Sequence, residues 1–374
     1  MVALSYYPDD PRIRRESETL ARAGYAIDIL CLRNQRQPKV EHFGSIIAHR
    51  IVEGMNKERL FFYLWLSTKF MVAAFIHLNK LRMRRQHALI HVHNLPDHLV
   101  FVGLWQKVRG LPIILDLHDL TVELFESKWR HRRGRVMRPL LKMVEKLSCG
   151  FADELITTSI GFKERLSARG VQPEKITLIL NSADERIFRN QWPREFTKSE
   201  RGTRLLYHGT VAERFGLDVA IDALAKVQQV IPETTLSIYG KYDTVYRAQL
   251  EAQVTQLGLS DRVHFGDYLQ LEEIREIIAK SDIGIVPYRS DGFMDLALST
   301  KTFEYVTMQL PVVASRLPAL QNIFDSNCIR YFEPGRAVEL AEKIIEFCLN
   351  PALRRSCAER ARQAYQANAW PVME

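Results

Sequence analysis

The stretch Ser299-Thr-Lys-Thr-Phe-Glu-Tyr-Val-Thr-Met-Gln-Leu-Pro-Val-Val-Ala-Ser315 predicts a short helix followed by a buried strand. Ser299 or Thr300 can cap the amides that open the helix, and Pro311 ends it. The apolar run after Pro311 is typical of a parallel strand that is covered on both faces. A helix that begins beside such a sheet offers its free amides to a phosphate.

Lys301 and Glu304 stand in the first turn of this predicted helix and one turn further on. A cation and a carboxylate therefore lie toward the same end of the helix. That pairing suits a nucleoside diphosphate and its ribose. The alternative is an ordinary capped helix with one surface ion pair.

The composition is that of a globular protein with room for two domains. The chain has 374 residues, of which 47% are hydrophobic and 26% charged. Five cysteines without paired metal spacing fit reduced thiols, and no N-terminal signal pattern is present, so we expect a cytoplasmic protein. The net charge of +8 predicts an anionic partner: a nucleotide, a nucleic acid or an acidic membrane surface.

The first half of the chain alternates between strands and helices. Residues 2–5 and 26–32 are predicted strands, with a helix over 13–23 between them, which makes a βαβ unit. Ligands of such sheets lie beyond the carboxyl ends of the strands. Arg12 precedes the helix at that edge, so it can meet an acceptor or a phosphate. A solvated basic first turn is an equally good interpretation.

Two later strands of this half end in histidine-containing turns. Residues 88–93 lead into His93-Asn94, and residues 112–117 lead into His118-Asp119. Two such turns at neighbouring strand ends indicate a functional edge. We considered a metal site at Asp116 and Asp119. We predict none, because alternation sends the two carboxylates in different directions and no third ligand is evident nearby.

A long aromatic segment interrupts the alternation. Residues 60–81 are apolar, with basic residues on both flanks. Lys69, His77 and Asn79 argue against a membrane-spanning helix. Two alternatives remain: a helix that lies on a membrane surface, and a core helix that packs on the sheet.

The basic run Lys128-Trp-Arg-His-Arg-Arg-Gly-Arg135, continued by Arg138, follows in the same half. It is either a solvated face or a patch for an anionic partner. Beside an aromatic helix, we expect that partner to be anionic lipid. No nucleic-acid-binding motif accompanies the run, so we predict no nucleic-acid partner.

The second half begins a new nucleotide-type unit after a polar linker near residues 190–202. A strand over 205–209 ends at Gly209, and the loop Thr210–Gly216 leads into a helix. Gly209 lets backbone amides approach an anion, and Arg214 can add charge-assisted hydrogen bonds. The topology places Arg214 at the same edge as Lys301 and Glu304.

The whole chain resembles family 4 of the retaining glycosyltransferases, which have the GT-B fold. The resemblance rests on six stretches that occur in family order: Tyr6-Tyr-Pro-Asp-Asp-Pro-Arg-Ile-Arg-Arg15, His91-Val-His-Asn94, Asp116-Leu-His-Asp119, His208-Gly-Thr-Val-Ala-Glu-Arg-Phe-Gly216, Arg262-Val-His-Phe-Gly266 and Lys301-Thr-Phe-Glu-Tyr305. It implies an α/β protein of two Rossmann-like domains whose parallel sheets face an interdomain cleft. Residues 1–188 are expected to bind the acceptor and residues 189–374 the nucleotide sugar.

The resemblance also implies roles for individual residues. Glu304 matches a carboxylate expected on the ribose, and His118 matches a histidine near the transferring sugar, so these two are the candidate catalytic residues. The remaining expected donor-binding residues are Gly209, Thr210, Arg214, Ser299, Thr300 and Lys301. The expected acceptor-side residues are Arg12, His93, Asn94 and Asp119.

The expected function is therefore transfer of a sugar, with retention, from a nucleoside-diphosphate sugar to a glycan or lipid-linked acceptor of a cell-surface polysaccharide. The expected place is the inner face of a membrane, and neither a metal nor a cofactor is required. One alternative is a sugar-nucleotide epimerase that uses His93, His118 and Asp119 as acid and base groups. Another is a non-catalytic glycan-assembly partner, because Leu296 stands where the family has a glutamate eight positions before Glu304.

Overall fold

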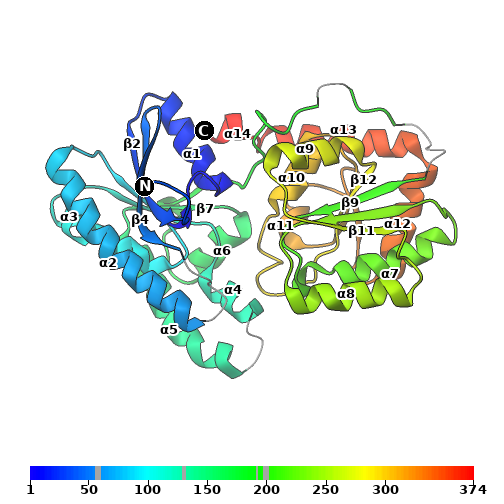
Figure 1. The fold of residues 1–374 in the computed structure, drawn as a ribbon, viewed down its shortest axis with the longest axis horizontal. Helices are drawn as coiled ribbons and strands as arrows, with labels where there is room; N and C mark the ends of the chain where they lie inside the picture. Colours follow the sequence, from blue (N-terminus) through cyan, green and yellow to red (C-terminus); the bar gives the residue numbers. More distant parts are fainter. Residues whose placement is uncertain (55–59, 129–131, 191–192, 197–201) are drawn as a thin grey trace. The chain divides into compact units, whose positions relative to one another are not determined.

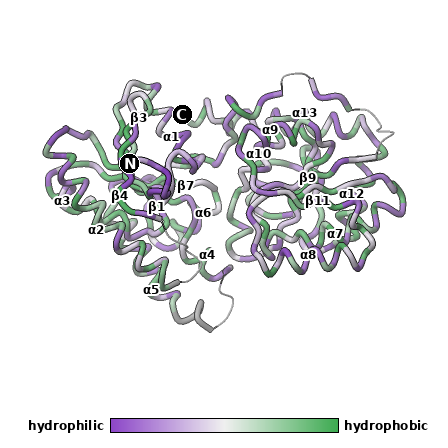
Figure 2. The backbone as a smooth tube through the Cα atoms, in the orientation of Figure 1, coloured by the Kyte–Doolittle hydropathy of each residue, from purple (hydrophilic) through white to green (hydrophobic). Residues whose placement is uncertain are grey.

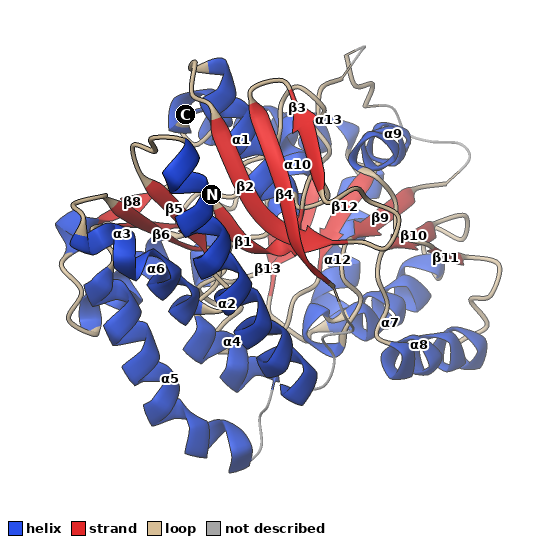
Figure 3. Ribbon diagram, turned by 60° about the vertical axis from the view of Figure 1, so that its left-hand side comes forward, coloured by secondary structure: helices blue, strands red, loops and turns tan. Residues whose placement is uncertain are grey.

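The computed structural model describes all of the chain except residues 55–59, 129–131, 191–192 and 197–201, and it leaves the side chains of 60 and 132–136 undescribed. The chain folds as two compact units, Met1–Leu180 and Asn181–Glu374. Each unit is an α/β domain built on a parallel sheet (Figures 1 and 3). The prediction of two Rossmann-like domains is confirmed.

The sheet of the first unit has eight strands in the order β3-β4-β2-β1-β5-β6-β7-β8. All neighbouring strands are parallel except the edge pair β3 and β4. The hairpin that forms this pair is absent from the sequence prediction. The strands are β1 (Val2–Tyr6), β2 (Ile27–Arg33), β3 (Val40–Phe43), β4 (Ile46–Glu53), β5 (Ile90–His93), β6 (Ile113–Leu117), β7 (Glu154–Thr157) and β8 (Ile176–Leu178).

The helices of this unit connect the strands. Asp10 caps the first of them by accepting a hydrogen bond from the Arg12 amide at 3.1 Å, and Pro11 opens it. The helices are α1 (Pro11–Arg22), α2 (Leu60–Arg84), η1 (Asp97–Gly103), α3 (Leu104–Val108), α4 (Thr121–Lys128), α5 (Arg132–Phe151), α6 (Ile160–Ala168) and η2 (Pro173–Lys175).

Helix α2 packs on the sheet along one face, as the core alternative requires, whereas the membrane-surface alternative stays a prediction. Leu66, Phe70, Ala74 and Leu78, spaced four residues apart, are buried, and the helix packs on β4, β1 and η1. Its other faces expose large apolar side chains, and Figure 2 shows hydrophobic colouring along much of it. Among the described residues, Phe61–Arg84 is the one helical stretch long and apolar enough to cross a membrane by length and composition alone, and 28% of its most apolar window is buried.

The basic run after α4 lies largely outside the described residues. Residues 129–131 have no described placement, and nothing is described of the side chains up to 136. Arg138 on α5 pairs with Glu126 on α4 at 3.0 Å. The anionic-lipid interpretation of this run therefore stays a prediction.

The second unit has a six-stranded, fully parallel sheet in the order β11-β10-β9-β12-β13-β14. Its strands are β9 (Arg204–His208), β10 (Thr235–Tyr239), β11 (Val263–Gly266), β12 (Ile283–Val286), β13 (Val312–Ser315) and β14 (Arg330–Phe332). Its helices are η3 (Glu213–Phe215), α7 (Leu217–Gln228), α8 (Thr244–Gln256), α9 (Leu271–Lys280), α10 (Thr300–Thr307), α11 (Pro318–Gln321), α12 (Ala337–Leu349), α13 (Pro351–Gln366) and α14 (Trp370–Met373).

The stretch from Ser299 to Ser315 forms α10 and β13 as predicted, with one difference. Ser299 occupies the N-cap position, but its side chain makes no capping hydrogen bond. Its hydroxyl is hydrogen-bonded instead to the Tyr288 hydroxyl at 2.9 Å. Every residue from Lys301 to Thr307 is buried, so α10 is a core helix and the surface ion-pair alternative is wrong.

Candidate active site

In the second unit, two glycine turns meet where β9 and β10 end. Gly209 has φ +116°, and a Cβ on Gly240 would lie only 1.7 Å from the Gly209 carbonyl oxygen. A Cβ on Gly209 would lie 3.1 Å from Cε of Lys301. These turns therefore leave no room for larger side chains, and the Lys301 side chain reaches the Gly209 turn.

Lys301 is enclosed by aromatic rings. Its Nζ lies 4.3 Å from the ring centroid of Tyr207, 4.7 Å from that of Tyr288 and 5.3 Å from that of Phe215. It donates hydrogen bonds to the hydroxyls of Tyr207, at 3.3 Å, and Tyr288. Burial lowers the pKa of Lys301 to about 7, although the nearby Glu304 opposes this shift. A bound anion would restore the charge of this amine.

Glu304 is buried beside a histidine of the neighbouring strand. Its Oε2 lies 3.1 Å from Nε2 of His208, the last residue of β9. Burial and the charge of Lys301 hold the pKa of His208 well below its usual range, so the imidazole is neutral. The carboxylate of Glu304 therefore faces an uncharged ring.

Arg214 occupies the short helix η3 in the loop after β9. Its guanidinium lies 5.1 Å from the ring centroid of Phe215 and 5.9 Å from that of Phe293. Its Nη1 is buried and has no hydrogen-bond partner among the described residues. A cation held on aromatic faces with a free donor suits a phosphate.

The other predicted donor-binding residues contribute mainly through the backbone. Thr210 is exposed, and its carbonyl oxygen accepts a hydrogen bond from the Tyr207 hydroxyl at 2.6 Å. Ser299 is the N-cap residue of α10 and Thr300 its first residue, so their main-chain amides lie next to that of Lys301 at the start of the helix. The second unit therefore places two cations, Arg214 and Lys301, over the ring of Phe215, with Lys301 reaching the Gly209 turn and Glu304 one turn further along α10.

Leu296 stands where the family has a glutamate, and Asp295 is the carboxylate next to it in the chain. Asp295 precedes Leu296, but its two carboxylate oxygens accept the Ser290 hydroxyl at 2.8 and 3.0 Å. Asp295 is thus already bound within its own loop.

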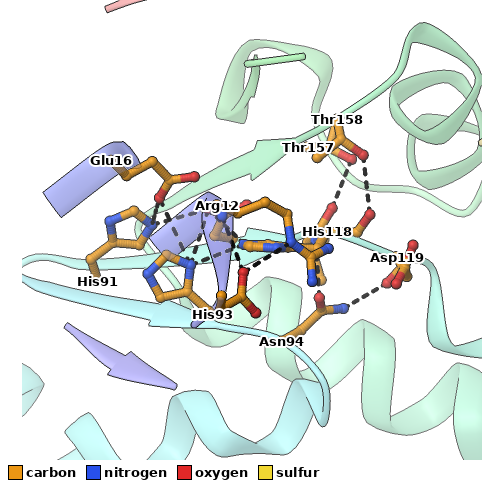
Figure 4. Close-up of polar contacts among 12 residues, drawn as sticks. Arg12, Glu16, His91, His93, Asn94, His118, Asp119, Thr157 and Thr158 are labelled. Atoms are coloured by element: carbon orange, nitrogen blue, oxygen red, sulfur yellow. Dashed lines mark hydrogen bonds and ion pairs between the residues drawn. The ribbon is translucent and has the colours of Figure 1, made fainter. Parts of the chain in front are cut away.

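In the first unit, Asn94 joins the ends of β5 and β6. Its amide nitrogen donates to Asp97 Oδ1 at 3.0 Å and to the main-chain carbonyl of Asp119 at 2.6 Å. Its amide oxygen accepts from the main-chain amide of His118 at 2.9 Å. Figure 4 shows that Asn94 connects the two histidine-containing turns. The turns therefore lie at neighbouring strand ends, as predicted.

Asp116 is the centre of a buried histidine cluster. Its Oδ2 lies 3.1 Å from Nε2 of His118, and 3.3 Å from both Nε2 of His91 and Nδ1 of His93. Burial opposes ionisation, but these histidines hold the pKa of Asp116 well below its usual range. Burial and the charge of Asp116 raise the pKa of Glu16, while burial lowers that of His93 to about 3.

A cavity of about 480 Å³ lies beside this cluster. The predicted residues Arg12, His93, Asn94 and His118 all line it, whereas Asp119 does not and enters the site through its carbonyl. The cavity is also lined by Tyr63 of α2 and Lys128 of α4, which belong to the aromatic segment and to the basic run of the sequence analysis and were not expected at this site.

Sequence reasoning also missed Glu16. The structure brings this residue of α1 together with His93, Asp116 and His118, and one ligand atom from each lies within 4.8 Å of the others. The premise that no third metal ligand lies near Asp116 is therefore wrong. The available signal was that Glu16 follows Arg12 by four residues, which puts both on one helix face.

Comparisons with known proteins define the class. Residues 12–186 match the family described as Glycosyltransferase Family 4, and residues 188–364 match the family described as Glycosyl transferases group 1. The chain belongs to the group 1 glycosyltransferases of the GT-B type, and it is a transferase enzyme.

Individual relatives are distant. The chain is 24% identical over 291 residues to MMP alpha-(1->4)-mannosyltransferase of Mycolicibacterium hassiacum, a match that covers 72% of this chain and 64% of that relative. Among solved structures it is similar to sucrose-phosphate synthase from Thermosynechococcus elongatus, with a TM-score of 0.75, 21% identity and coverage of 100% and 96%. Anabaena HepE in complex with UDP gives a TM-score of 0.71, 17% identity and the same coverage. These likenesses show the fold.

Proposed function

We propose that the protein transfers a sugar from a nucleoside-diphosphate sugar to a lipid-linked or growing glycan, with retention of configuration. The observation that carries this proposal is the buried amine of Lys301, which reaches the Gly209 turn from the first turn of a helix that also carries Glu304. Burial of a charged lysine without an ion-pair partner costs free energy of folding. A bound diphosphate would provide that partner and offset the cost.

The donor half of the proposal uses residues of the second unit only. The diphosphate binds to the amides of residues 299–301 beside the Gly209 turn, with Lys301 and Arg214 as its cations. Glu304 accepts hydrogen bonds from the ribose hydroxyls. The solved structure of HepE contains UDP, which supports a nucleoside diphosphate as ligand.

The chemical contribution of these residues is electrostatic. As the sugar leaves, negative charge develops on the diphosphate, and fixed cations and amide dipoles stabilise it. The protein thus supplies the positive charge that the leaving group needs, and we expect no metal ion to be required at the diphosphate. His118 acts on the side of the transferring sugar.

The acceptor half uses the cavity of the first unit. Arg12 and Lys128 give this cavity two cations that suit a phosphate, and His93, Asn94 and His118 offer hydrogen bonds to sugar hydroxyls. This combination fits a sugar carried on a phosphate-linked lipid.

The surface next to this cavity supports a lipid. Tyr63 of α2 lines the cavity, and Phe61, Phe62 and Trp65 of the same helix are exposed. Helix α5 adds exposed Leu140, Met143 and Leu147, and both helices pack on η1 and run side by side in Figures 1 and 3. Exposed Lys69, Lys142 and Lys146 provide positive charge for anionic headgroups. We propose a peripheral enzyme on the cytoplasmic face of a membrane.

The test is a transfer assay with labelled sugar nucleotides and a lipid extract that contains polyprenyl-phosphate-linked sugars. We expect label from one donor to enter the organic phase and to be released by mild acid. The Lys301→Met variant should give no such product. If the parent protein binds a sugar nucleotide but transfers nothing to lipid-linked or soluble glycan acceptors, the transferase proposal is wrong and the epimerase and non-catalytic alternatives remain.

A further inference from the structure

Four potential metal ligands converge in the first unit from four separate segments. They are Oε2 of Glu16, Nδ1 of His93, Oδ2 of Asp116 and Nε2 of His118, which come from α1, β5, β6 and the turn after β6. Figure 4 shows the Glu16 carboxylate above the histidine rings. The pairwise separations are 2.9 Å between the two histidine nitrogens, 3.1 and 3.3 Å from these to Asp116, and 3.8 Å from His93 to Glu16.

Hydrogen atoms alone cannot satisfy this arrangement. Nδ1 of His93, Nε2 of His118 and Oδ2 of Asp116 form a triangle in which each atom is within 3.3 Å of the other two. Each pair needs one donor and one acceptor, and Asp116 accepts only. If both ring nitrogens carry protons, they face each other at 2.9 Å, and if one does not, its lone pair faces the carboxylate. One contact is therefore always unfavourable.

Glu16 provides an independent observation. Its Oε2 is buried and has no hydrogen-bond partner among the described residues. It lies 3.8 Å from both Nδ1 of His93 and Nε2 of His91, beyond hydrogen-bond range. The buried Oε2 of a second carboxylate thus lies within 4.8 Å of Asp116 and close to the histidine nitrogens, without a bonded proton donor among the described residues.

We propose that Glu16, His93, Asp116 and His118 bind one divalent transition-metal ion, with Zn²⁺ as the expected ion. Two imidazoles and two carboxylates are ligands that Zn²⁺ prefers, and the carboxylates balance its charge. Tetrahedral bonds of about 2.0 to 2.1 Å separate neighbouring ligand atoms by roughly 3.3 to 3.4 Å. The four separations given above, 2.9 to 3.8 Å, span this value, and all four ligand atoms lie within 4.8 Å of one another. A site built mainly of oxygen ligands would suit Mg²⁺ or Ca²⁺ instead.

The ion would also fix the tautomers of two cavity residues. A metal on Nδ1 of His93 and on Nε2 of His118 places a proton on the other nitrogen of each ring. Those nitrogens, Nε2 of His93 and Nδ1 of His118, are buried without hydrogen-bond partners among the described residues, and both histidines line the 480 Å³ cavity. Each ring then carries its remaining N–H on a defined nitrogen.

The experiment is a Co²⁺ titration of the chelator-treated full-length protein, followed by the visible absorption of tetrahedral Co²⁺. We expect one Co²⁺ per chain, displaced by one Zn²⁺. In His93→Gln and Glu16→Gln the affinity should fall at least tenfold. The exposed His264 supplies the matched control, and His264→Gln should bind as the parent does.

Zn²⁺ should also raise the melting temperature of the parent but not of Glu16→Gln, because the ion binds the native state. Glu16 is partly exposed, so the fold of this variant is checked by circular dichroism. Stoichiometric binding that is unchanged in Glu16→Gln, or no visible Co²⁺ band in the parent, would overturn the proposal. Neither readout requires sugar transfer, so this inference and the proposed function fail separately.

Discussion

Nζ of Lys301 donates a hydrogen bond to the Tyr207 hydroxyl at 3.3 Å, across a separation of 94 residues in the chain. This contact joins the start of α10 to the strand that ends in the Gly209 turn. It holds a lysine in an aromatic enclosure where its ammonium form is disfavoured. The amine is therefore poised to respond to an anion.

Diphosphate binding should take up a proton above neutral pH. In the free protein the pKa of Lys301 is about 7, and a bound diphosphate favours the charged amine. At pH 8 we expect uptake of about one proton per UDP, or per whichever nucleoside diphosphate binds, with affinity falling as pH rises above 7. Calorimetry in two buffers of different ionisation enthalpy measures this. Lys301→Met should show no uptake, and equal heats for the parent in both buffers would contradict the assignment.

The Lys301→Met variant should be more stable than the parent at neutral pH. The pKa of Lys301 is lowered from 10.5 to about 7 by burial, so the unfolded chain binds the proton more strongly between these values. The parent's stability therefore rises with pH across that window, and the advantage of methionine is largest below about pH 7. We expect a gain of about 1 to 2 kcal/mol there.

Denaturant unfolding of both proteins at pH 6.5, 8 and 10 measures the difference. It should shrink as the pH rises. A constant difference across the three pH values would mean that Lys301 is not held neutral by burial.

Replacing Glu304 by alanine should weaken nucleotide binding while the fold persists. Loss of hydrogen bonds to a charged group costs about 1.5 to 3 kcal/mol, which is roughly ten- to hundredfold in Kd. The comparison is Glu359→Ala, an exposed acid on α13. Titration calorimetry with the preferred nucleoside diphosphate should show the loss for Glu304→Ala only. Equal affinity of the two variants would remove the ribose assignment.

The exposed face of α2 should contribute to membrane binding. Phe61 and Trp65 are 73% and 46% exposed, and each large apolar side chain contributes up to about 1.5 to 3 kcal/mol when it leaves water. Serine at both positions should lower sedimentation with anionic vesicles at least tenfold without changing the melting temperature.

The matched control for this surface is Val245→Ser in the second unit, where Val245 is 70% exposed. This variant should sediment as the parent does. If the α2 double variant sediments as well as the parent does, α2 is not the membrane contact.

The sequence predicted the positions of many strands along the chain, because the signals for them are local. Apolar runs that end at glycine or proline located β9, β10 and β12, and the turns at His93 and His118 identified the functional edge of the first unit. Helix α10 and strand β13 could be read from Pro311 and the valines that follow it. The β3–β4 hairpin was missed because β3 is a short edge strand of exposed and half-buried residues, although β4 is largely buried.

The parts that failed depend on contacts between distant segments. No sequence pattern near Lys301 predicts that Tyr207 and Phe215 enclose its side chain. Glu16 reaches Asp116 only because α1 packs over the strand ends, and no spacing rule connects them. The sequence did not separate the core and membrane-surface alternatives for α2, because apolar side chains cover both its buried and its exposed faces.

The central claim is that the second unit binds a nucleoside-diphosphate sugar through Lys301 and Glu304. The most direct test is a thermal-shift panel of UDP, GDP, ADP, CMP and dTDP, with their common sugar conjugates, on the parent, Lys301→Met and Glu304→Ala. A ligand that binds only the native state raises its melting temperature. We predict a selective shift by one nucleoside diphosphate in the parent that both variants lose. A folded parent that none of these compounds stabilises, or a shift that both variants retain, would contradict the account.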